Sequence, residues 1–164
     1  MGAIMSIKKV EIGFCRETMK LSTRGRYGVR IMLELALHFG EGPVLLKDIA
    51  ERQAISEKYL WQLINPLKSM GLIKSIRGAR GGYVLARDPA EINLREILRI
   101  LEGSLCLVDC VDDPAACDRS ESCITREIWS ETSKNISQSL ESMTLGKMVE
   151  RHKNRGDGAL GYSI

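Results

Sequence analysis

Two short amphipathic segments joined by a few residues constrain the fold of this chain more than any other feature. The first segment spans about residues 46–53, and the second follows Ser56, a residue typical of a helix N-cap. Apolar residues recur at helical spacing in the second segment and predict one buried face: Leu60, Leu63, Ile64, Leu67 and Met70. Because two short helices joined by a tight turn form a helix-turn-helix, we expect this motif here.

A cationic, glycine-rich connection follows these helices and predicts a β-hairpin. Residues 72–76 and 83–86 have the pattern of two short strands, and residues 77–82 between them contain Arg77, Arg80 and three glycines. A phosphate-binding loop would need a Gly-Lys-Ser/Thr run and a following helix, and neither is expected here. The hairpin therefore predicts a wing beside the helix-turn-helix.

Apolar periodicity predicts two further helices around this motif. One begins at Thr23 and ends before Gly40, and the other spans about residues 94–101. Inside the second helix of the motif, Pro66 removes a backbone hydrogen bond at a cost of about 3 kcal/mol, so we expect a kink or an early end near Asn65. The whole pattern predicts a mostly α-helical winged helix-turn-helix with a small β-hairpin wing.

The net charge of +3 hides an uneven distribution along the chain. Residues 20–89 carry 12 basic and 6 acidic side chains, whereas residues 90–123 carry 3 basic and 8 acidic ones. Because DNA phosphates attract basic surfaces, we expect residues 19–89 to form a domain that binds double-stranded DNA. Tyr59 and Trp61 are equally compatible with packing. The candidate contact residues are Arg24, Arg26, Lys58, Tyr59, Trp61, Gln62, Arg77 and Arg80.

Four of the five cysteines lie within 18 residues, namely Cys106, Cys110, Cys117 and Cys123. Neither a secretory signal nor an apolar run long enough to span a membrane is recognisable, so we expect a cytoplasmic protein. A reducing compartment favours metal or redox chemistry over structural disulfides. The three cysteines from Cys110 onward offer soft ligands from one loop, although they lack the Cys-x2-Cys pair of typical zinc sites, and free cysteines are the alternative.

The C-terminal part, residues 124–151, predicts a dimerisation helix with a narrow apolar stripe that runs from Ile124 toward Met143, with Thr144 as the cap of a final turn. Such a helix has little to pack against in its own chain, so we expect it to pair with its copy in a homodimer. Residues 90–123 then form a linker helix and a cysteine-rich sensor loop. Residues 1–18 form a leader outside the domain, and residues 152–164 form a flexible tail.

Three runs of this sequence resemble the Rrf2 family of bacterial winged-helix regulators. They are the run from Lys20 to Arg30, the run from Ile55 to Leu63 and the distinctive segment Arg77-Gly-Ala-Arg-Gly-Gly-Tyr83. The family includes iron-sulfur regulators of cluster assembly and of the nitric-oxide response. The resemblance covers about residues 19–150 and implies a homodimer that reads a pseudo-palindromic operator, with one winged helix on each half-site.

The resemblance also implies a cofactor in the cysteine-rich segment. Family members carry three cysteine ligands there, so Cys110, Cys117 and Cys123 are expected to bind a [2Fe-2S] or [4Fe-4S] iron-sulfur cluster. Cluster-assembly members have a histidine three residues after the third cysteine, whereas this chain has Arg126. The fourth ligand is therefore unidentified, and the candidates are Cys106, Asp118, Glu121 and Glu127.

Taken together, these features predict a transcriptional repressor whose affinity for DNA depends on the cluster and so on redox state, nitric oxide or iron supply. The alternative is a cluster-free regulator controlled by thiol oxidation or by docking of a metabolic enzyme. An enzyme is disfavoured, because the sequence shows no base-nucleophile pair, no nucleotide loop and only two histidines.

Overall fold

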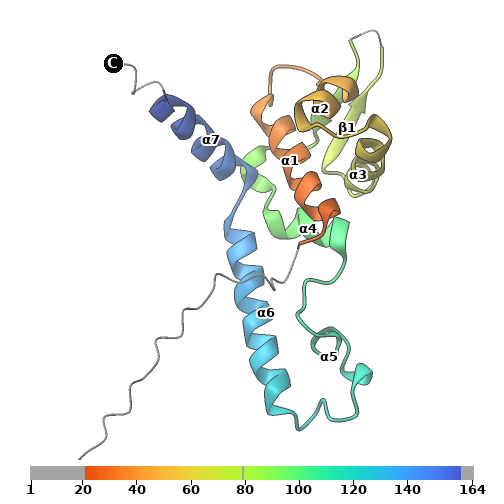
Figure 1. The fold of residues 1–164 in the computed structure, drawn as a ribbon, viewed down its shortest axis with the longest axis vertical. Coiled ribbons are helices and arrows are strands. Elements are labelled where there is room, and N and C mark those ends of the chain that lie inside the picture. The colour runs from red at the N-terminus through yellow and green to blue at the C-terminus, as the bar shows by residue number, and fades with distance from the viewer. Residues whose placement is uncertain (1–20, 79, 160–164) are drawn as a thin grey trace, which may run out of the picture.

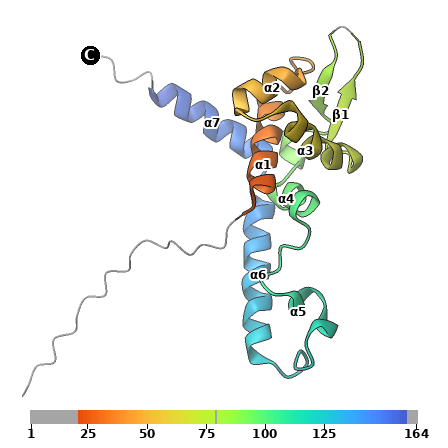
Figure 2. The same cartoon turned by 45° about the vertical axis from the view of Figure 1, so that its right-hand side comes forward.

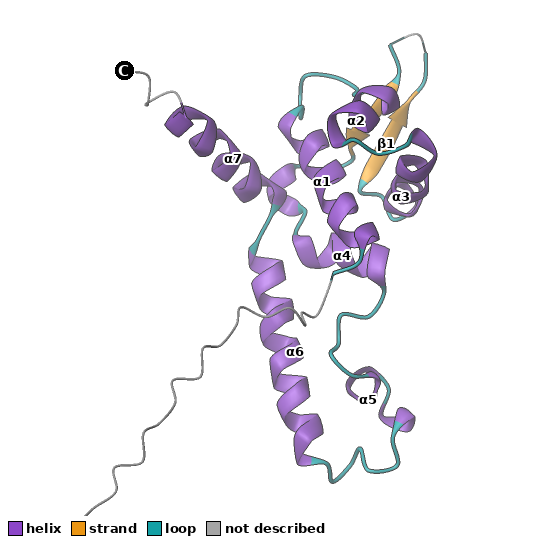
Figure 3. Cartoon of the chain, viewed as in Figure 1, coloured by secondary structure: helices purple, strands orange, loops and turns teal. Residues whose placement is uncertain are grey.

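The computed structural model describes residues 21–78 and 80–159, so the leader expected at residues 1–18 lies outside the described residues. The chain is mostly helical with one small antiparallel sheet (Figure 3). In chain order the elements are α1 (Thr23–Leu37), α2 (Leu46–Gln53), α3 (Glu57–Ser69), β1 (Ile73–Ile76), β2 (Gly82–Leu85), η1 (Pro89–Glu91), α4 (Leu94–Glu102), α5 (Asp109–Asp112), η2 (Pro114–Ala116), α6 (Ile124–Ser142) and α7 (Leu145–Ala159).

These elements form two parts, which we call the head and the stalk (Figures 1 and 2). The head consists of α1 to α4 with the two strands. The stalk consists of α6 together with the loop of residues 103–123, which contains α5 and runs beside α6. The first turns of α7 pack against α1 and η1, where the stalk returns to the head.

The expected helix-turn-helix is present as α2 and α3. Ala54 lies between them in the left-handed region, with φ 53°, and makes the turn tight. The Ser56 side chain accepts a hydrogen bond from the backbone N–H of Tyr59, which confirms the predicted N-cap. Leu60, Leu63, Ile64 and Leu67 bury the predicted face of α3 in the head. The expected burial of Met70 was wrong, because this residue lies at the C-cap and is 66% exposed.

Of the kink or early end expected near Asn65, the early end was wrong, because α3 continues through Pro66 to Ser69. Leu63, Ile64 and Leu67 are essentially inaccessible to solvent and hold the helix on both sides of the proline. The carbonyl of Gln62, which loses its usual N–H partner, belongs to an exposed residue and can bind water instead. Burial of three large side chains outweighs one hydrogen bond that solvent can replace.

The wing is built from β1 and β2, with Ile73 opposite Leu85 and Ile76 opposite Gly82. Val44, which precedes α2, pairs with Tyr83 through two backbone hydrogen bonds of 3.0 and 2.9 Å. Ile73 and Leu85 are buried in the head, whereas Ile76 is 46% exposed. The base of the hairpin is therefore anchored and its tip projects from the head, as a wing requires.

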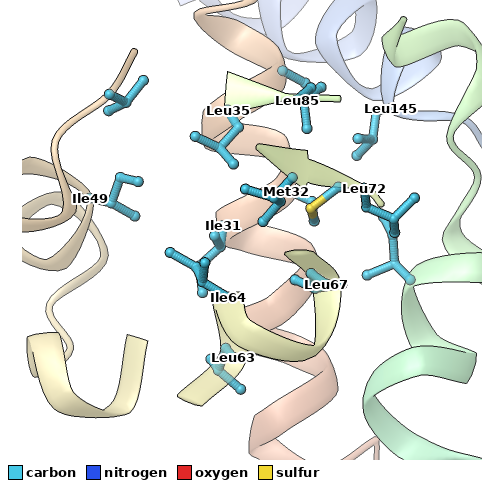
Figure 4. Close-up of a cluster of buried hydrophobic side chains, with 14 of the residues drawn as sticks. Ile31, Met32, Leu35, Ile49, Leu63, Ile64, Leu67, Leu72, Leu85 and Leu145 are labelled. Atoms are coloured by element: carbon cyan, nitrogen blue, oxygen red, sulfur yellow. The ribbon is translucent and has the colours of Figure 1, made fainter. Parts of the chain in front are cut away.

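The hydrophobic core joins residues from both sides of residue 89, where the sequence suggested a domain boundary (Figure 4). Ile31, Met32 and Leu35 of α1 lie at its centre. Ile92, the α4 residues Ile97 and Leu101, and Leu145 of α7 are each at most 3% exposed in the same cluster. The winged helix thus needs α4 and the start of α7 to complete its core, because hydrophobic faces on several elements must be covered together.

The dimerisation helix expected over residues 124–151 is divided into α6 and α7. The division lies at Thr144, whose hydroxyl oxygen accepts a 3.3 Å hydrogen bond from the N–H of Lys147, as expected of a cap. The chain between them is extended, and the carbonyl of Met143 accepts a 2.9 Å hydrogen bond from the N–H of Leu94. Helix α7 continues to Ala159, so the flexible tail expected from residue 152 begins as helix, while residues 160–164 lie outside the described part. Among the described helices, none combines the length and apolar character that a membrane crossing requires.

Candidate nucleic-acid interface and cysteine loop

The exposed face of α3 carries three of the predicted contact residues. Lys58, Trp61 and Gln62 are spaced so that they share one side of the helix, opposite its buried leucines. All three are exposed, and the Trp61 side chain is 53% exposed although it is large and apolar. A polar helix face with long side chains that reach outward has the shape and chemistry needed to enter a DNA major groove.

Tyr59 has a different environment from its neighbours on α3. Its ring packs edge-on against Tyr27 of α1, with 6.0 Å between ring centroids, and it lies against the hydrophobic core. The guanidinium of Arg30 lies 5.2 Å from the centre of the Tyr27 ring and extends this contact. Of the two roles that the sequence left open for Tyr59, the structure supports packing, and the residue links α3 to α1.

The wing tip presents Arg77 and Arg80, both exposed, beside the helix-turn-helix. Its turn depends on glycine, because a Cβ atom added at Gly81 would lie 2.5 Å from the carbonyl oxygen of Ile76. At the base, Gly82 has φ 156° and a Cβ there would lie 2.4 Å from the Val44 oxygen. The close approach of backbone atoms therefore requires glycine at both positions. Arg77 and Arg80 lie between the strands with exposed side chains, which could contact phosphates or enter a minor groove.

Arg24 and Arg26 are also exposed, but the structure does not bring them near the wing. They lie in the first turn of α1, at the end of the head where α4 and the stalk meet it. The wing tip lies at the opposite end of the head in both views (Figures 1 and 2). One chain thus presents basic side chains at two separate places rather than in one patch.

The cysteine loop, residues 103–123, contains the short helix α5 and the turn η2 rather than a featureless coil. Cys106, Cys110, Cys117 and Cys123 are all half-buried free thiols. The N–H of Leu107 donates a 3.2 Å hydrogen bond to Oγ of Ser133, which is 3% exposed on α6. This bond attaches the first part of the loop to the stalk helix.

Arg126 connects the two arms of the cysteine loop. Its Nε donates a 2.7 Å hydrogen bond to the carbonyl of Cys110, and its Nη1 donates a 3.4 Å bond to the carbonyl of Ser120. A guanidinium stays protonated and has no acceptor lone pair, so it cannot replace a histidine as a metal ligand. At this position Arg126 therefore holds the backbone of the loop instead of a metal.

Two groups in the loop have altered acidity. The Thr125 hydroxyl, 3.0 Å from the Sγ of Cys123, and then the Arg126 backbone N–H lower the pKa of this thiol. Cys106 donates a hydrogen bond of 3.6 Å to Asp112, and hydrogen bonds from Ser104 and then Cys106 lower the pKa of the Asp112 carboxyl. Cys123 is therefore more readily ionised than an ordinary cysteine, and the Cys106 thiol is engaged as a donor.

The chemistry of these donors fits an iron-sulfur cluster, because thiolates are its usual ligands. Cys110, Cys117 and Cys123 would hold such a group. In the described residues, however, no three His, Cys, Asp or Glu side chains gather closely enough to hold a metal ion. A cluster held by these three cysteines would require the loop to close further, so that its thiols share one coordination sphere.

The candidates for a fourth ligand are not drawn together in the structure. Cys106 is bonded to Asp112 and lies near the end of α4. Asp118, Glu121 and Glu127 form no group of three metal-ligating side chains with the cysteines within the described residues. The structure thus adds no fourth ligand to the three cysteines.

The sequence did not predict the structural roles of two acidic residues, Glu34 and Glu102. Glu34 is only 8% exposed and binds Arg52 at 3.1 Å and Gln53 at 3.1 Å, which joins α1 to α2. Glu102 binds the start of α1 from the end of α4. One signal for Glu34 was available, since it lies at helical spacing beside the buried Ile31 and Leu35.

Comparison with known proteins gives a consistent result along most of the chain. A family model described as an iron-dependent transcriptional regulator, Rrf2, matches residues 21–151. The HTH-type transcriptional regulator CymR of Bacillus subtilis is 46% identical over 127 residues, which cover 77% of this chain and 87% of that protein.

Solved structures of similar proteins share the fold. That of B. subtilis CymR, described as the global cysteine regulator, has a TM-score of 0.69 at 42% identity and covers 82% of this chain and 98% of its own. T. potens IscR has a TM-score of 0.68 at 47% identity, over 82% of this chain and 88% of its own. An oxidized form of Staphylococcus aureus CymR has a TM-score of 0.66 at 38% identity, over 80% and 97% of the two chains. The mostly helical winged-helix fold predicted from the sequence is confirmed.

Proposed function

Because the chain belongs to the Rrf2 family of transcriptional regulators, we propose that it is a repressor that binds a pseudo-palindromic operator as a homodimer. The observation that carries the DNA-binding part is the exposed face of α3 beside an arginine-tipped wing. Lys58, Trp61 and Gln62 reach base edges in the major groove, and the wing contacts the adjacent minor groove. A regulator that binds DNA in this way acts in the cytoplasm.

A binding assay on a selected operator tests the DNA surface. Duplexes that bind the full chain are first selected from a random-sequence pool. Gln62→Ala is expected to cost about 1–3 kcal/mol of discrimination at one base pair, because the variant no longer reaches a base edge there. Lys134→Ala, an exposed change on α6, serves as the control. Unchanged selectivity in the Gln62 variant would contradict the assignment of α3.

The second part of the proposal is that the cysteine loop controls DNA binding through an iron-sulfur cluster held by Cys110, Cys117 and Cys123. Three half-buried thiols in one loop support it, together with the lowered pKa of Cys123. The cluster would supply redox chemistry and reactivity toward oxygen and nitric oxide. Arg126 keeps the backbone at Cys110 and Ser120 in place, and the acidic loop stays away from DNA phosphates.

Anaerobic purification tests this part directly. We expect brown protein that contains iron and labile sulfide, and a change in operator affinity when a chelator removes the iron. Replacement of Cys110, Cys117 or Cys123 by serine should abolish the colour, whereas Cys15→Ser is the control. Colourless, iron-free protein with unaltered affinity would contradict the cluster.

Thiol oxidation is the second candidate function of the same loop. It is favoured because the described residues do not assemble a metal site, while the pKa of Cys123 is lowered. A thiolate is the form that peroxide attacks, so Cys123 is the expected site of first oxidation. Mass spectrometry of peroxide-treated, iron-free protein would then show new modifications or linkages among Cys106, Cys110, Cys117 and Cys123.

A further inference from the structure

The carboxylate of Glu102 binds the first turn of α1 from a distant part of the sequence. Its Oε1 accepts a 2.6 Å hydrogen bond from the Ser22 hydroxyl and a 2.8 Å bond from the backbone N–H of Gly25. Ser22 is the N-cap of α1, so both bonds lie at the positive end of this helix. Glu102 is also the last residue of α4, directly before the cysteine loop.

The last turn of α4 packs closely against α1. A Cβ atom added at Gly25 would lie 2.2 Å from Oε1 of Glu102, and one added at Gly28 would lie 1.9 Å from Cδ1 of Leu101. Both glycines are buried in α1 and face the last turn of α4. Because packed interfaces of this kind do not deform gradually, a shift of the α4 terminus must either carry the start of α1 with it or break these contacts.

The chain from Glu102 to the sensor cysteines is short and attached at defined points. Gly103 follows with φ 88°, a conformation that fixes the direction in which the loop leaves α4. Three residues later Cys106 bonds to Asp112, and Leu107 bonds to Ser133 on α6. Only residues 103–107 separate the α4 terminus from these attachment points. A rearrangement that brings the loop cysteines together is therefore expected to shift the α4 terminus.

Helix α1, which Glu102 contacts at its first turn, also packs against the DNA-binding helix α3. Arg24 and Arg26 lie in the turn that Glu102 holds. Further along the helix, Tyr27 contacts Tyr59 of α3, and Ile31 is fully buried in the shared core. A change in the first turn of α1 would therefore displace Arg24 and Arg26 directly and could reach α3 through the contact between Tyr27 and Tyr59.

We propose that Glu102 is the positioning residue that transmits the state of the cysteine loop to α1 and so to the DNA-binding surface. This inference rests on the proposed function, because it assumes that the loop is the sensor. In one loop state the carboxylate holds Ser22 and Gly25. In the other state the α4 terminus shifts, these two hydrogen bonds break, and the start of α1 loosens.

Hydrogen-deuterium exchange on the full chain tests whether Glu102 transmits the state of the loop, and the test does not require the natural signal of the regulator to be known. The probe is N-ethylmaleimide, which modifies the loop thiols of the iron-free protein and changes the conformation of the loop. In the wild type we expect exchange of the backbone amides in the first turn of α1 to rise about tenfold after modification, since a hydrogen bond to a charged group is lost. In Glu102→Ala exchange should already be fast and should not respond.

Glu96→Ala is the matched control, because Glu96 lies on the same helix and binds Arg87 rather than α1. It should respond as the wild type does. Glu102→Gln, which retains an acceptor oxygen, should show an intermediate response and provides a folded variant if the alanine variant unfolds. A wild type that does not respond, or a Glu102→Ala variant that responds like the wild type, would overturn the inference.

Operator affinity in the two loop states separates this inference from the proposed function. Coupled sites typically differ five- to 150-fold in affinity, and Glu102→Ala should reduce the wild-type ratio to below about twofold. A wild type whose two states bind the operator equally, but whose α1 exchange still responds, would contradict the proposed regulation and leave the Glu102 contact supported. A variant that keeps the full wild-type ratio would overturn the role of Glu102.

Discussion

A hydrogen atom in place of a side chain at Gly28 allows α1 and α4 to touch. A methyl group there would overlap Cδ1 of Leu101, which is itself 3% exposed and packed in the core. Gly28→Ala should therefore destabilise the protein by about 1–3 kcal/mol, although alanine is the better helix former. Urea denaturation measures the change.

The double variant Gly28→Ala, Leu101→Ala is the internal control. Because the shorter side chain at residue 101 removes the overlap, the double variant should lose less stability than the sum of the single variants. Additive losses would show that the overlap is relieved by other movements and that α1 and α4 are not closely coupled at this point.

Cys123 provides a residue-scale prediction about pH. Because Thr125 lowers the pKa of the thiol, the thiolate is present at lower pH than in an ordinary cysteine. Thr125→Val should move the alkylation profile of Cys123 to higher pH and slow its reaction with iodoacetamide at pH 7 about two- to tenfold. Peptide mass spectrometry of iron-free protein follows this rate, and Thr132→Val on the same helix is the control. An unchanged profile would show that Thr125 does not stabilise the thiolate.

At this scale the sequence suggests the chemistry of the cysteine loop, which stays a prediction, but it does not reveal the contacts of single residues. The types and spacing of the cysteines indicated a sensor loop, and Arg126 was recognised as unlike the family histidine. The sequence did not reveal that Arg126 binds the Cys110 carbonyl or that Glu102 binds Gly25, because those bonds join residues 16 and 77 positions apart. Such pairs depend on how elements pack, and local patterns do not encode packing partners.

At the scale of elements, the wing offers a test of charge. The double variant Arg77→Ala, Arg80→Ala should weaken binding to all duplexes about equally and reduce the slope of log affinity against log salt by about one for each phosphate that is no longer neutralised. Fluorescence anisotropy at several salt concentrations measures both effects. Lys134→Ala, which removes one positive charge from α6, is the control, and an equal effect there would show that only net charge matters.

Elements were predicted well where the apolar periodicity is clear, as for α2, and where a capping residue marks the start, as for α3 at Ser56. They were predicted less well where tertiary packing overrides local preference. Pro66 stays inside α3 because buried neighbours hold the helix. The long C-terminal helix is broken near Met143, where the chain pairs with residues that precede α4; Thr144 marked the start of the last turn, but no local pattern marked its pairing partner.

At the scale of the whole molecule, the stalk helix exposes more apolar surface than a single chain needs. Ile124, Ile128 and Trp129 are 65%, 53% and 42% exposed along α6. Large exposed apolar side chains on one helix indicate a protein interface, which supports the proposed homodimer. Ile128→Asp should therefore yield monomers in size-exclusion chromatography with light scattering, and operator affinity should fall because a monomer binds only one half-site.

A matched change elsewhere on α6 serves as the control for this prediction. Gln138→Asp adds the same charge at an exposed position of the helix and should leave the oligomeric state unchanged. Dimers of undiminished stability in the Ile128 variant would place the interface elsewhere on the molecule.

The path of the chain around α4 has a further consequence. The chain leaves the head after Glu102, at one end of α4, and returns beside Ile92 and Leu94, at the other end. A helix of this length spans about 14 Å, a distance that a linker of about five residues can bridge. The stalk is thus an insertion that can be exchanged as a cassette: a chain with residues 104–142 replaced by such a linker should keep a folded head, and stalks from relatives should be transferable onto it.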